Sequence, residues 1–228
     1  MKFNILKENH ADIKSFRVAS ILGKFDLSSA KVSERFEGNI SLDDNEWSIG
    51  VIYGNSGTGK STIAKELFGQ TYVKAFEYSH KAVLDEMPQG ASIDDITRIF
   101  NSVGFSSPPS WLKPYEVLSN GEKMRVDLAQ AIMENKSPIV FDEFTSVVDR
   151  NVAKIASFAV AKAIRKQNKK FIAVSCHEDI LEWLEPDWVF NTNTMTFFLP
   201  RNTKDQKSPW KSPNAIAPIG NSLGSIII

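Results

Sequence analysis

The sequence has few cysteines and no long apolar runs, and both absences limit what the protein can be. Cys176 is the only cysteine, which excludes an intrachain disulfide and a zinc site built from several thiolates, and fits a reducing compartment. No run approaches the roughly 18 apolar residues of a membrane-spanning helix, because even Ile139–Phe141 is followed by two acids. Met1 to His10 alternates apolar and charged positions, unlike a secretory signal. We therefore expect a cytoplasmic protein with no transmembrane segment of its own.

Net charge is also absent, since 27 Lys and Arg balance 27 Asp and Glu. The total charge thus gives no global attraction to nucleic acid or to anionic membranes, and any such partner needs a local patch. The sequence is 42% hydrophobic and 24% charged, with 12 Gly and 10 Pro, as in ordinary folded domains. A chain of this length can bury a sizeable core.

Hydrophobic periodicity predicts an α/β fold. We expect β segments at 15–22, 35–42 and 47–53, helices at 61–68, 92–103, 124–133 and 151–164, buried strands at 139–141 and 171–174, and a proline-rich loop at 104–114. A strand, a helix and a strand over 139–174 form a βαβ unit, which implies a parallel core sheet. Residues 1–200 are expected to form the domain, and residues 201–228 a tail or the remnant of a further region.

A phosphate-binding loop is the strongest motif. Gly54 to Ser61 matches G-x-x-x-x-G-K-[ST] in full, after a strand-like run and before a helix-like run. Its glycines let backbone N–H groups face a phosphate at a helix N-terminus. Lys60 can reach the β- and γ-phosphates, and the Ser61 hydroxyl can ligate Mg²⁺.

Two acids end the strand-like run Ile139–Phe141. We predict that Asp142 holds Mg²⁺ and that Glu143 is the general base that activates the attacking water. The alternative is a strand that ends in two solvated acids.

A second turn, Ser119–Glu122, precedes another predicted helix and is a second candidate anion site. Together these motifs resemble the ATP-binding cassette (ABC) ATPases, which are P-loop NTPases, and the turn resembles their signature motif. The resemblance implies an antiparallel N-terminal β subdomain, a short helical subdomain inserted at about 71–118, and a head-to-tail homodimer. In that dimer the turn contacts ATP held by the partner subunit.

Other positions fit the same family in order along the chain. Asp149 resembles the D-loop residue, His177 the switch histidine that holds the γ-phosphate, and Gln89 the Q-loop residue. The resemblance implies catalytic roles for Lys60, Glu143 and His177, with ATP and Mg²⁺ as ligands. The residues expected to contact ATP within one chain are Gly54, Asn55, Ser56, Gly57, Thr58, Gly59, Lys60, Ser61, Thr62 and Gln89, and those expected to act across the dimer are Ser119, Asn120, Gly121 and Glu122.

Some features depart from transporter cassettes. Asn120 replaces a glycine, but Asn tolerates positive φ better than other non-glycine residues, so the turn can keep its shape. Phe144 stands where a proline is common. Glu122 followed by Lys123, and the short segment from Ser61 to Leu118, resemble soluble DNA-maintenance or mobile-element ABC ATPases more closely. We expect an ATPase in a soluble assembly. The alternatives are a transporter subunit whose membrane partner is a separate chain, and a nucleotide switch with negligible hydrolysis.

Two further features have competing interpretations. Seven cations and no acid lie between Arg150 and Lys170, which fits either a solvated helix or a nucleic-acid contact. Phe25 and Phe36 precede the phosphate loop, where the family often stacks an aromatic ring on adenine, yet either could belong to the core.

Overall fold

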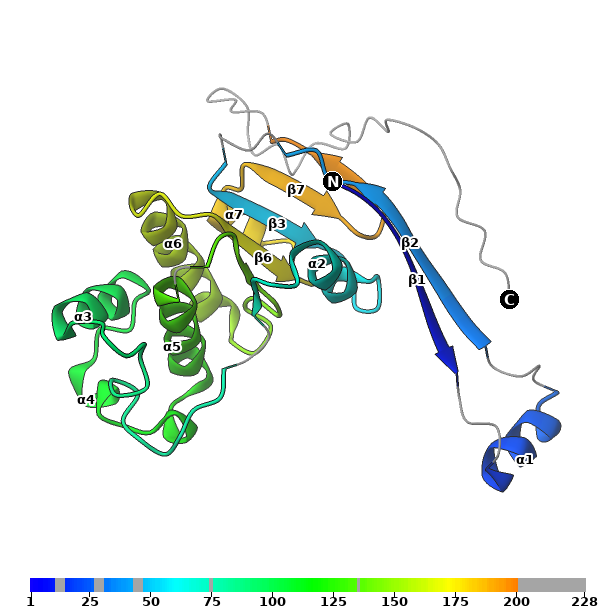
Figure 1. Cartoon of the computed structure of the whole chain (residues 1–228), viewed down its shortest axis with the longest axis horizontal. Coiled ribbons are helices and arrows are strands. Elements are labelled where there is room, and N and C mark those ends of the chain that lie inside the picture. The colour runs from blue at the N-terminus through cyan, green and yellow to red at the C-terminus, as the bar shows by residue number, and fades with distance from the viewer. Residues whose placement is uncertain (11–14, 27–30, 43–46, 74–75, 135, 201–228) are drawn as a thin grey trace.

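A six-stranded sheet in the order β4-β5-β6-β3-β7-β8 organises the chain (Figure 1). The computed structural model describes residues 1–10, 15–26, 31–42, 47–73, 76–134 and 136–200. The strands of this sheet are β3 Ile49–Tyr53, β4 Tyr72–Val73, β5 Ile139–Phe141, β6 Phe171–Ser175, β7 Trp188–Asn191 and β8 Thr196–Phe198. Neighbours from β4 to β7 are parallel and β8 is antiparallel, which confirms the predicted mixed α/β sheet.

The helices lie mainly between the parallel strands in sequence. They are α1 Phe16–Lys24, α2 Lys60–Phe68, α3 Ile93–Ser102, α4 Pro108–Trp111, the 3₁₀ helix η1 Tyr115–Val117, α5 Asn120–Met133, α6 Arg150–Lys166 and α7 Ile180–Leu184. Helix α6 connects β5 to its parallel neighbour β6, so the predicted βαβ unit is present. Helices α3 and α4 lie between β4 and α5, within the residues expected to form the helical subdomain.

Alternation along the strands divides the core into two layers. In β6, Phe171 and Ala173 pack with the helices α3, α5 and α6, whereas Ile172 and Val174 pack on the opposite face with α2. Successive side chains of a strand point to opposite faces, so a fully apolar strand serves both layers. The functional motifs follow the carboxyl ends of these buried strands, where ligands bind in open α/β sheets.

A second sheet is an antiparallel ribbon of β1 (Lys2–His10) and β2 (Lys31–Asn39), with α1 in its connection. The ribbon extends away from the six-stranded sheet (Figure 1). At its base, Phe3 packs edge-on against Phe190 of β7, with ring centroids 5.7 Å apart. The ribbon therefore joins the core through aromatic contacts at one end.

Two local predictions were wrong. Residues 15–22 contribute to helix α1, because Val18, Ile21, Leu22 and Phe25 have helical spacing that their β-branched and aromatic neighbours obscured. The first strand is instead the alternating segment Lys2–His10. The proline-rich loop contains the short helix α4, because prolines in the first helical turn remove N–H groups that have no intrahelical partner.

Two further expectations concern a membrane-spanning helix and the C-terminal residues. Among the described residues, no helix is long and apolar enough to cross a membrane. The predicted tail, 201–228, lies outside the described residues.

Candidate active site

The phosphate loop connects β3 to α2, as its sequence context predicts. Gly59 is the N-cap of α2, has φ 85° and provides no side-chain cap, so the first N–H groups of the helix are left to a ligand. A Cβ atom at Gly59 would lie 2.4 Å from the ring of Phe36. Only glycine fits here, because both the left-handed backbone and the close ring exclude a side chain.

Residues that follow β7 support the other side of this loop. The Asn55 backbone N–H donates to Asn193 Oδ1 at 2.9 Å, and the hydroxyls of Thr58 and Thr192 lie 2.6 Å apart. Lys60 Nζ donates to the Asn55 carbonyl at 2.7 Å, which holds the ammonium over the loop. Thr192 and Asn193 were not predicted. Their one signal is their position after a buried strand of the parallel sheet.

Ser61 and Asp142 meet, as expected for a magnesium site. Ser61 Oγ donates to Asp142 Oδ1 at 3.1 Å, and Asp142 is buried. The Tyr72 hydroxyl donates to the other Asp142 oxygen, and burial followed by this contact raises the pKa of Tyr72. A hydroxyl beside a carboxylate is the oxygen donor set that Mg²⁺ prefers, so these residues fit the ion. Tyr72, in the short strand β4, was missed by the sequence reasoning.

Glu143 is held in an unusual backbone conformation. Its φ is 53° and that of Thr145 is 66°, so two non-glycine residues adopt the left-handed region within three positions. Between them Phe144 is fully buried, packs edge-on against Phe171 and donates its N–H to the Val174 carbonyl at 2.9 Å. Phe144, at the position often occupied by proline, therefore anchors the turn while the Glu143 side chain remains exposed.

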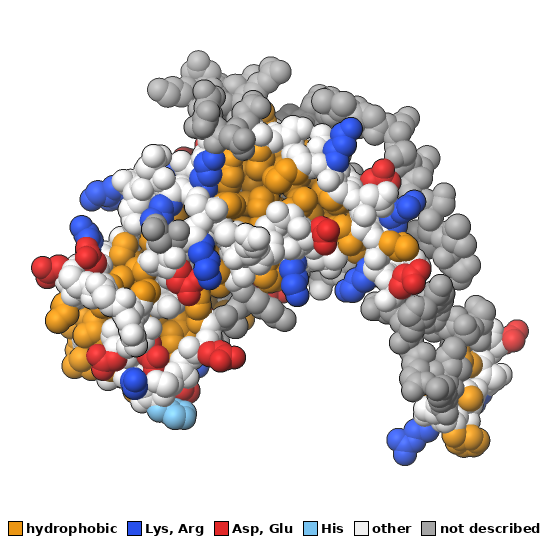
Figure 2. Space-filling view, viewed as in Figure 1, with side chains coloured by type: hydrophobic (Ala, Val, Ile, Leu, Met, Phe, Trp, Pro, Cys, Tyr) orange, Lys and Arg blue, Asp and Glu red, His pale blue; other side chains and the backbone are white. Residues whose placement is uncertain are grey.

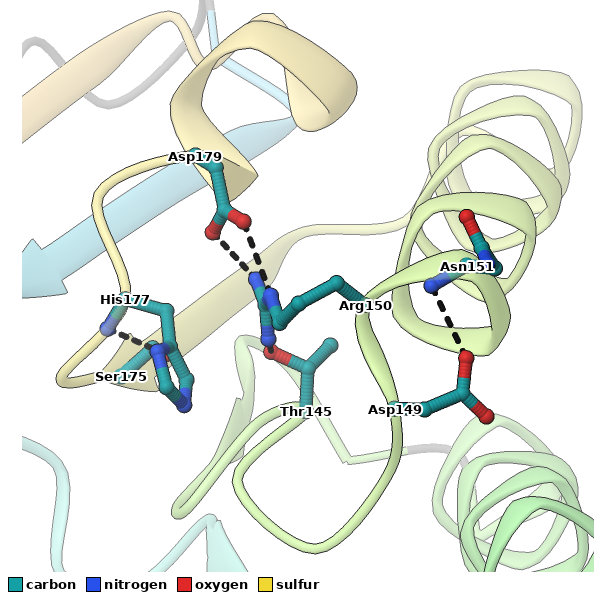
Figure 3. Close-up of polar contacts among 7 residues, drawn as sticks. All are labelled: Thr145, Asp149, Arg150, Asn151, Ser175, His177 and Asp179. Carbon is teal, nitrogen blue, oxygen red and sulfur yellow. Dashed lines mark hydrogen bonds and ion pairs between the residues drawn. The ribbon is translucent and has the colours of Figure 1, made fainter.

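His177 and Asp149 lie on loops next to this turn (Figure 3). His177 follows β6, is half-buried, and its backbone N–H donates to Ser175 Oγ at 3.1 Å. Asp149 is the N-cap of α6, and its carboxylate accepts from the N–H groups of Asn151 and Val152 at 3.0 and 3.1 Å. Because β5 and β6 are parallel neighbours, the segments that carry Glu143, Asp149 and His177 leave the same edge of the sheet.

The predicted signature turn is a complete helix cap. Ser119 caps α5, and its backbone N–H donates to the Glu122 carboxylate at 3.0 Å, which makes a capping box. Ser110 also donates to Glu122 at 2.7 Å, and this bond and those from Ser119 lower the pKa of Glu122. Asn120 is the first helical residue and needs no positive φ, contrary to the expectation for this position.

The signature turn and the D-loop share one pocket. Its lining includes Ser119, Asn120, Gly121 and Asp149, with Arg125 at its wall. Gly121 packs so closely on α6 that an added Cβ would lie 3.0 Å from Val152. These elements are therefore combined into one surface on a single chain, separate in sequence from the phosphate loop.

The helix that follows the signature turn is joined to the preceding segment by a half-buried carboxylate. Asp127 of α5 accepts from the hydroxyls of Tyr78 and Tyr115 at 2.7 and 2.8 Å, and the two rings stack with centroids 4.0 Å apart. Burial raises the pKa of Asp127 against the opposing effect of both hydrogen bonds. The signature helix and residues 78–115 are thus held together.

The aromatic residues upstream of the phosphate loop and the predicted Q-loop residue lie in different environments. Phe36 is buried against Gly59 and Phe25 is exposed at the end of α1, so Phe36 belongs to the core that supports the loop. Gln89 lies exposed in the turn before α3. No hydrogen bond within the described parts of the chain joins Gln89 to the phosphate loop, and its role in ATP binding stays a prediction.

The basic segment after Asp149 is largely occupied by internal contacts. Arg150 pairs with Asp179, Arg165 donates to the carbonyls of Leu184 and Glu185, Lys169 donates to the Ile132 carbonyl, and Lys170 lies over the Trp47 ring. On the face in Figure 2, cationic and anionic side chains are interspersed. Four of the seven cations thus have intramolecular partners, which weakens the nucleic-acid interpretation.

Comparisons with known proteins agree with this geometry. Residues 51–182 match the profile of the ATPase family associated with various cellular activities (AAA). Over 200 residues the chain is 24% identical to the energy-coupling factor transporter ATP-binding protein EcfA1 of Staphylococcus aureus strain USA300, covering 70% of this chain and 72% of that protein.

Solved structures of ABC proteins have similar folds. A transporter in an inward-facing conformation, described as of the metal-chelate ABC type, gives a TM-score of 0.57 at 19% identity over 72% of this chain and 75% of its own. The dimeric cassette MJ0796 in a post-hydrolysis state with ADP and Pi gives 0.55 at 16% identity over 69% and 87%. At these identities the likeness shows the fold alone, and that fold is the predicted ABC ATPase fold.

The expected closeness to soluble or DNA-maintenance ABC ATPases is not supported, because the relatives named above are transporter cassettes. That expectation rested on Glu122 followed by Lys123 and on the short segment from Ser61 to Leu118. Glu122 has a local structural role, because it completes the capping box of α5.

Proposed function

Since the chain belongs to the ATPase family associated with various cellular activities, we propose that it binds and hydrolyses ATP as a head-to-tail dimer. The observation that carries this proposal is the presence of two complementary half-sites on one chain. One is the phosphate loop with Ser61 and Asp142, and the other is the pocket between the signature turn and the D-loop. Packing two copies head to tail would place one half-site of each against the other half-site of its partner.

The phosphate half-site binds and orients the nucleotide. Uncapped N–H groups at the start of α2 and the Lys60 ammonium hold the phosphate oxygens. Ser61 and Asp142 would hold Mg²⁺, which neutralises charge on the phosphates when bound. Tyr72 fixes the Asp142 carboxylate through its hydroxyl.

Hydrolysis needs a base and a group that stabilises the leaving charge. Glu143, exposed at the end of β5, accepts a proton from the water that attacks the γ-phosphorus, and the bond to the β–γ bridging oxygen breaks to give ADP and phosphate. His177 donates a hydrogen bond to a γ-phosphate oxygen. Ser119 and Gly121 of the partner subunit complete the site from the other side.

We infer that this ATPase serves as the ATP-binding subunit of a membrane transporter and lies on the cytoplasmic side of the membrane. The curated relative EcfA1, named as a transporter ATP-binding protein, supports this assignment over an assembly without a membrane partner. Intramolecular partners for four of the seven cations between Arg150 and Lys170 weaken the support for nucleic acid. Co-purification of a membrane protein with the tagged chain tests the assignment, and recovery of nucleic acid instead would overturn it.

The catalytic proposal is tested by Glu143→Gln. The variant keeps the size of the side chain but cannot accept the proton, so turnover should fall by about 10²–10⁴-fold while ATP produces a stable dimer. Phosphate release and light scattering measure the two effects. Glu66→Gln, the same change at an exposed position of α2, is the matched control and should behave as wild type.

Two outcomes would contradict this proposal. Wild-type turnover in Glu143→Gln would exclude Glu143 as the base. Dimer formation by the wild-type chain with negligible ATP turnover would instead favour a nucleotide switch.

A further inference from the structure

Arg150 connects three segments of the candidate active site (Figure 3). It is the first residue of α6, directly after Asp149. Its guanidinium forms a two-pronged pair with the Asp179 carboxylate, with Nε donating to Oδ2 at 2.8 Å and Nη2 donating to Oδ1. Its remaining nitrogen, Nη1, lies 3.5 Å from Thr145 Oγ1, at the limit of a hydrogen bond.

Each partner of Arg150 lies close in sequence to a predicted catalytic residue. Thr145 follows Glu143 by two positions, is 1% exposed, and shares the left-handed backbone turn. Asp179 follows His177 by two positions. One guanidinium therefore links the turn that carries the base, the D-loop and the loop that carries the histidine.

The position of this cation is electrostatically unfavourable for the helix alone. The N-terminus of α6 carries the positive end of the helix dipole, where an acidic side chain is preferred. Asp149 satisfies that preference as the N-cap, and Arg150 follows it immediately. The bidentate pair with Asp179 and the ring of Trp183, whose centroid lies 5.0 Å from the guanidinium carbon, offset the repulsion.

Stability alone does not explain the pair well. The Arg150 side chain is 37% exposed and that of Asp179 is 41% exposed. Ion pairs with this exposure contribute little to folding, because water already solvates both charges. A planar, forked guanidinium does fix the direction of the groups that it bridges, which a lysine ammonium cannot do.

We propose that Arg150 is a positioning residue for ATP hydrolysis. It fixes the positions of the Glu143 turn and the His177 loop relative to the D-loop. The inference rests on the proposed function. Arg150 itself contacts neither reacting group and acts through Thr145 and Asp179. Losing the link should displace the base and the histidine without altering the phosphate loop, which lies outside these contacts.

Kinetics of four variants test this role. Arg150→Met and Asp179→Asn should each lower kcat by on the order of 10–100-fold, with the KM for ATP within about twofold and little change in Tm. The double variant should be no slower than the slower single variant, because both remove one link. Arg150→Lys should recover only part of kcat, since it keeps the charge but not the fork.

Arg165→Met is the matched control. Arg165 lies in the last turn of the same helix, at the opposite end from Arg150, and donates to the carbonyls of Leu184 and Glu185. It should lower Tm while leaving the kcat of the folded protein unchanged.

Retention of kcat within about twofold in Arg150→Met, or independent multiplicative effects of the two single variants, would overturn the inference. Glu143→Gln and wild type are assayed alongside. If wild type does not hydrolyse ATP, or Glu143→Gln hydrolyses it normally, the proposed function fails and the role of Arg150 fails with it. If those two behave as expected, a normal Arg150→Met removes only the role of Arg150.

Discussion

The N-termini of α2 and α5 both present backbone N–H groups, but they satisfy them in opposite ways. At α2 the cap is Gly59, which offers no side-chain acceptor. At α5 the cap is Ser119, which forms a reciprocal capping box with Glu122. The first helix therefore has donors left for an anion, whereas the second is already satisfied within its own turn.

Because of this difference, we expect the two turns to have separate functions. The phosphate loop is built to hold a ligand, and it is supported from outside by Phe36 and by Thr192 and Asn193. The signature turn is ordered by its own capping box before any ligand arrives, and Ser119 must exchange its hydrogen bonds to Glu122 before it can donate to a ligand held by a partner. We expect changes in the first turn to abolish nucleotide binding and changes in the second to affect the dimer.

The largest expected effect comes from adding one methyl group to the phosphate loop. Gly59→Ala should weaken ATP binding by at least about tenfold, because left-handed backbone costs a non-glycine residue about 1–2 kcal/mol before the clash with Phe36 is added. Titration with a fluorescent ATP analogue measures the affinity.

Gly121→Ala is the matched variant in the second turn. Its Cβ would lie 3.0 Å from Val152 Cγ1, a contact that a small shift relieves. Its affinity for ATP as a monomer should stay within about twofold, because the strained contact with Val152 lies outside the phosphate loop. Equal losses in the two alanine variants would remove the distinction between the turns.

A smaller effect is expected for Ser119→Ala. Removing the N-cap hydroxyl should cost about 1 kcal/mol of stability and slow turnover in the dimer, while the monomer binds ATP normally. Chemical denaturation, ATP titration and turnover at several protein concentrations separate these effects. Loss of ATP binding by the monomer would show that the signature turn also acts within its own subunit.

The smallest expected effect is on the pH dependence of the free energy of unfolding, through the Glu122 carboxylate. Hydrogen bonds from Ser110 and Ser119 lower its pKa, so the folded state favours the carboxylate. The resulting stabilisation is complete above the ordinary value of 4.5 and is lost as the pH falls through the lower folded value.

Glu122→Gln keeps an acceptor but cannot titrate. Between pH 7 and pH 4, wild type should lose at most about 1 kcal/mol more unfolding free energy than this variant, the size of one capping interaction. Urea unfolding at both pH values measures the difference. A larger acid loss in the glutamine variant would contradict the assigned direction.

The sequence predicted the contiguous motifs better than the residues that contact them from distant parts of the chain. Gly54–Ser61 and the strand before Asp142 were recognisable because their residues are contiguous and their spacing is set by local backbone geometry. Tyr72, Thr192 and Asn193 were not, since each contacts its partner across about 70 to 138 residues of sequence. The helix α1 was misread because short segments of β-branched and aromatic residues fit either period.

By itself, the sequence determined the α/β class, the phosphate loop and the Asp142–Glu143 pair, because each depends on neighbours within one element or turn. Only the tertiary structure decided that Tyr72 holds Asp142, that Phe36 supports Gly59 and that Arg150 joins two catalytic turns. Those contacts depend on strand order. The parallel pairing of β5 with β6 follows from their βαβ unit, which the sequence predicts. No local pattern encodes the placement of β3 between β6 and β7, which brings the phosphate loop to the same edge of the sheet as the segments after β5 and β6.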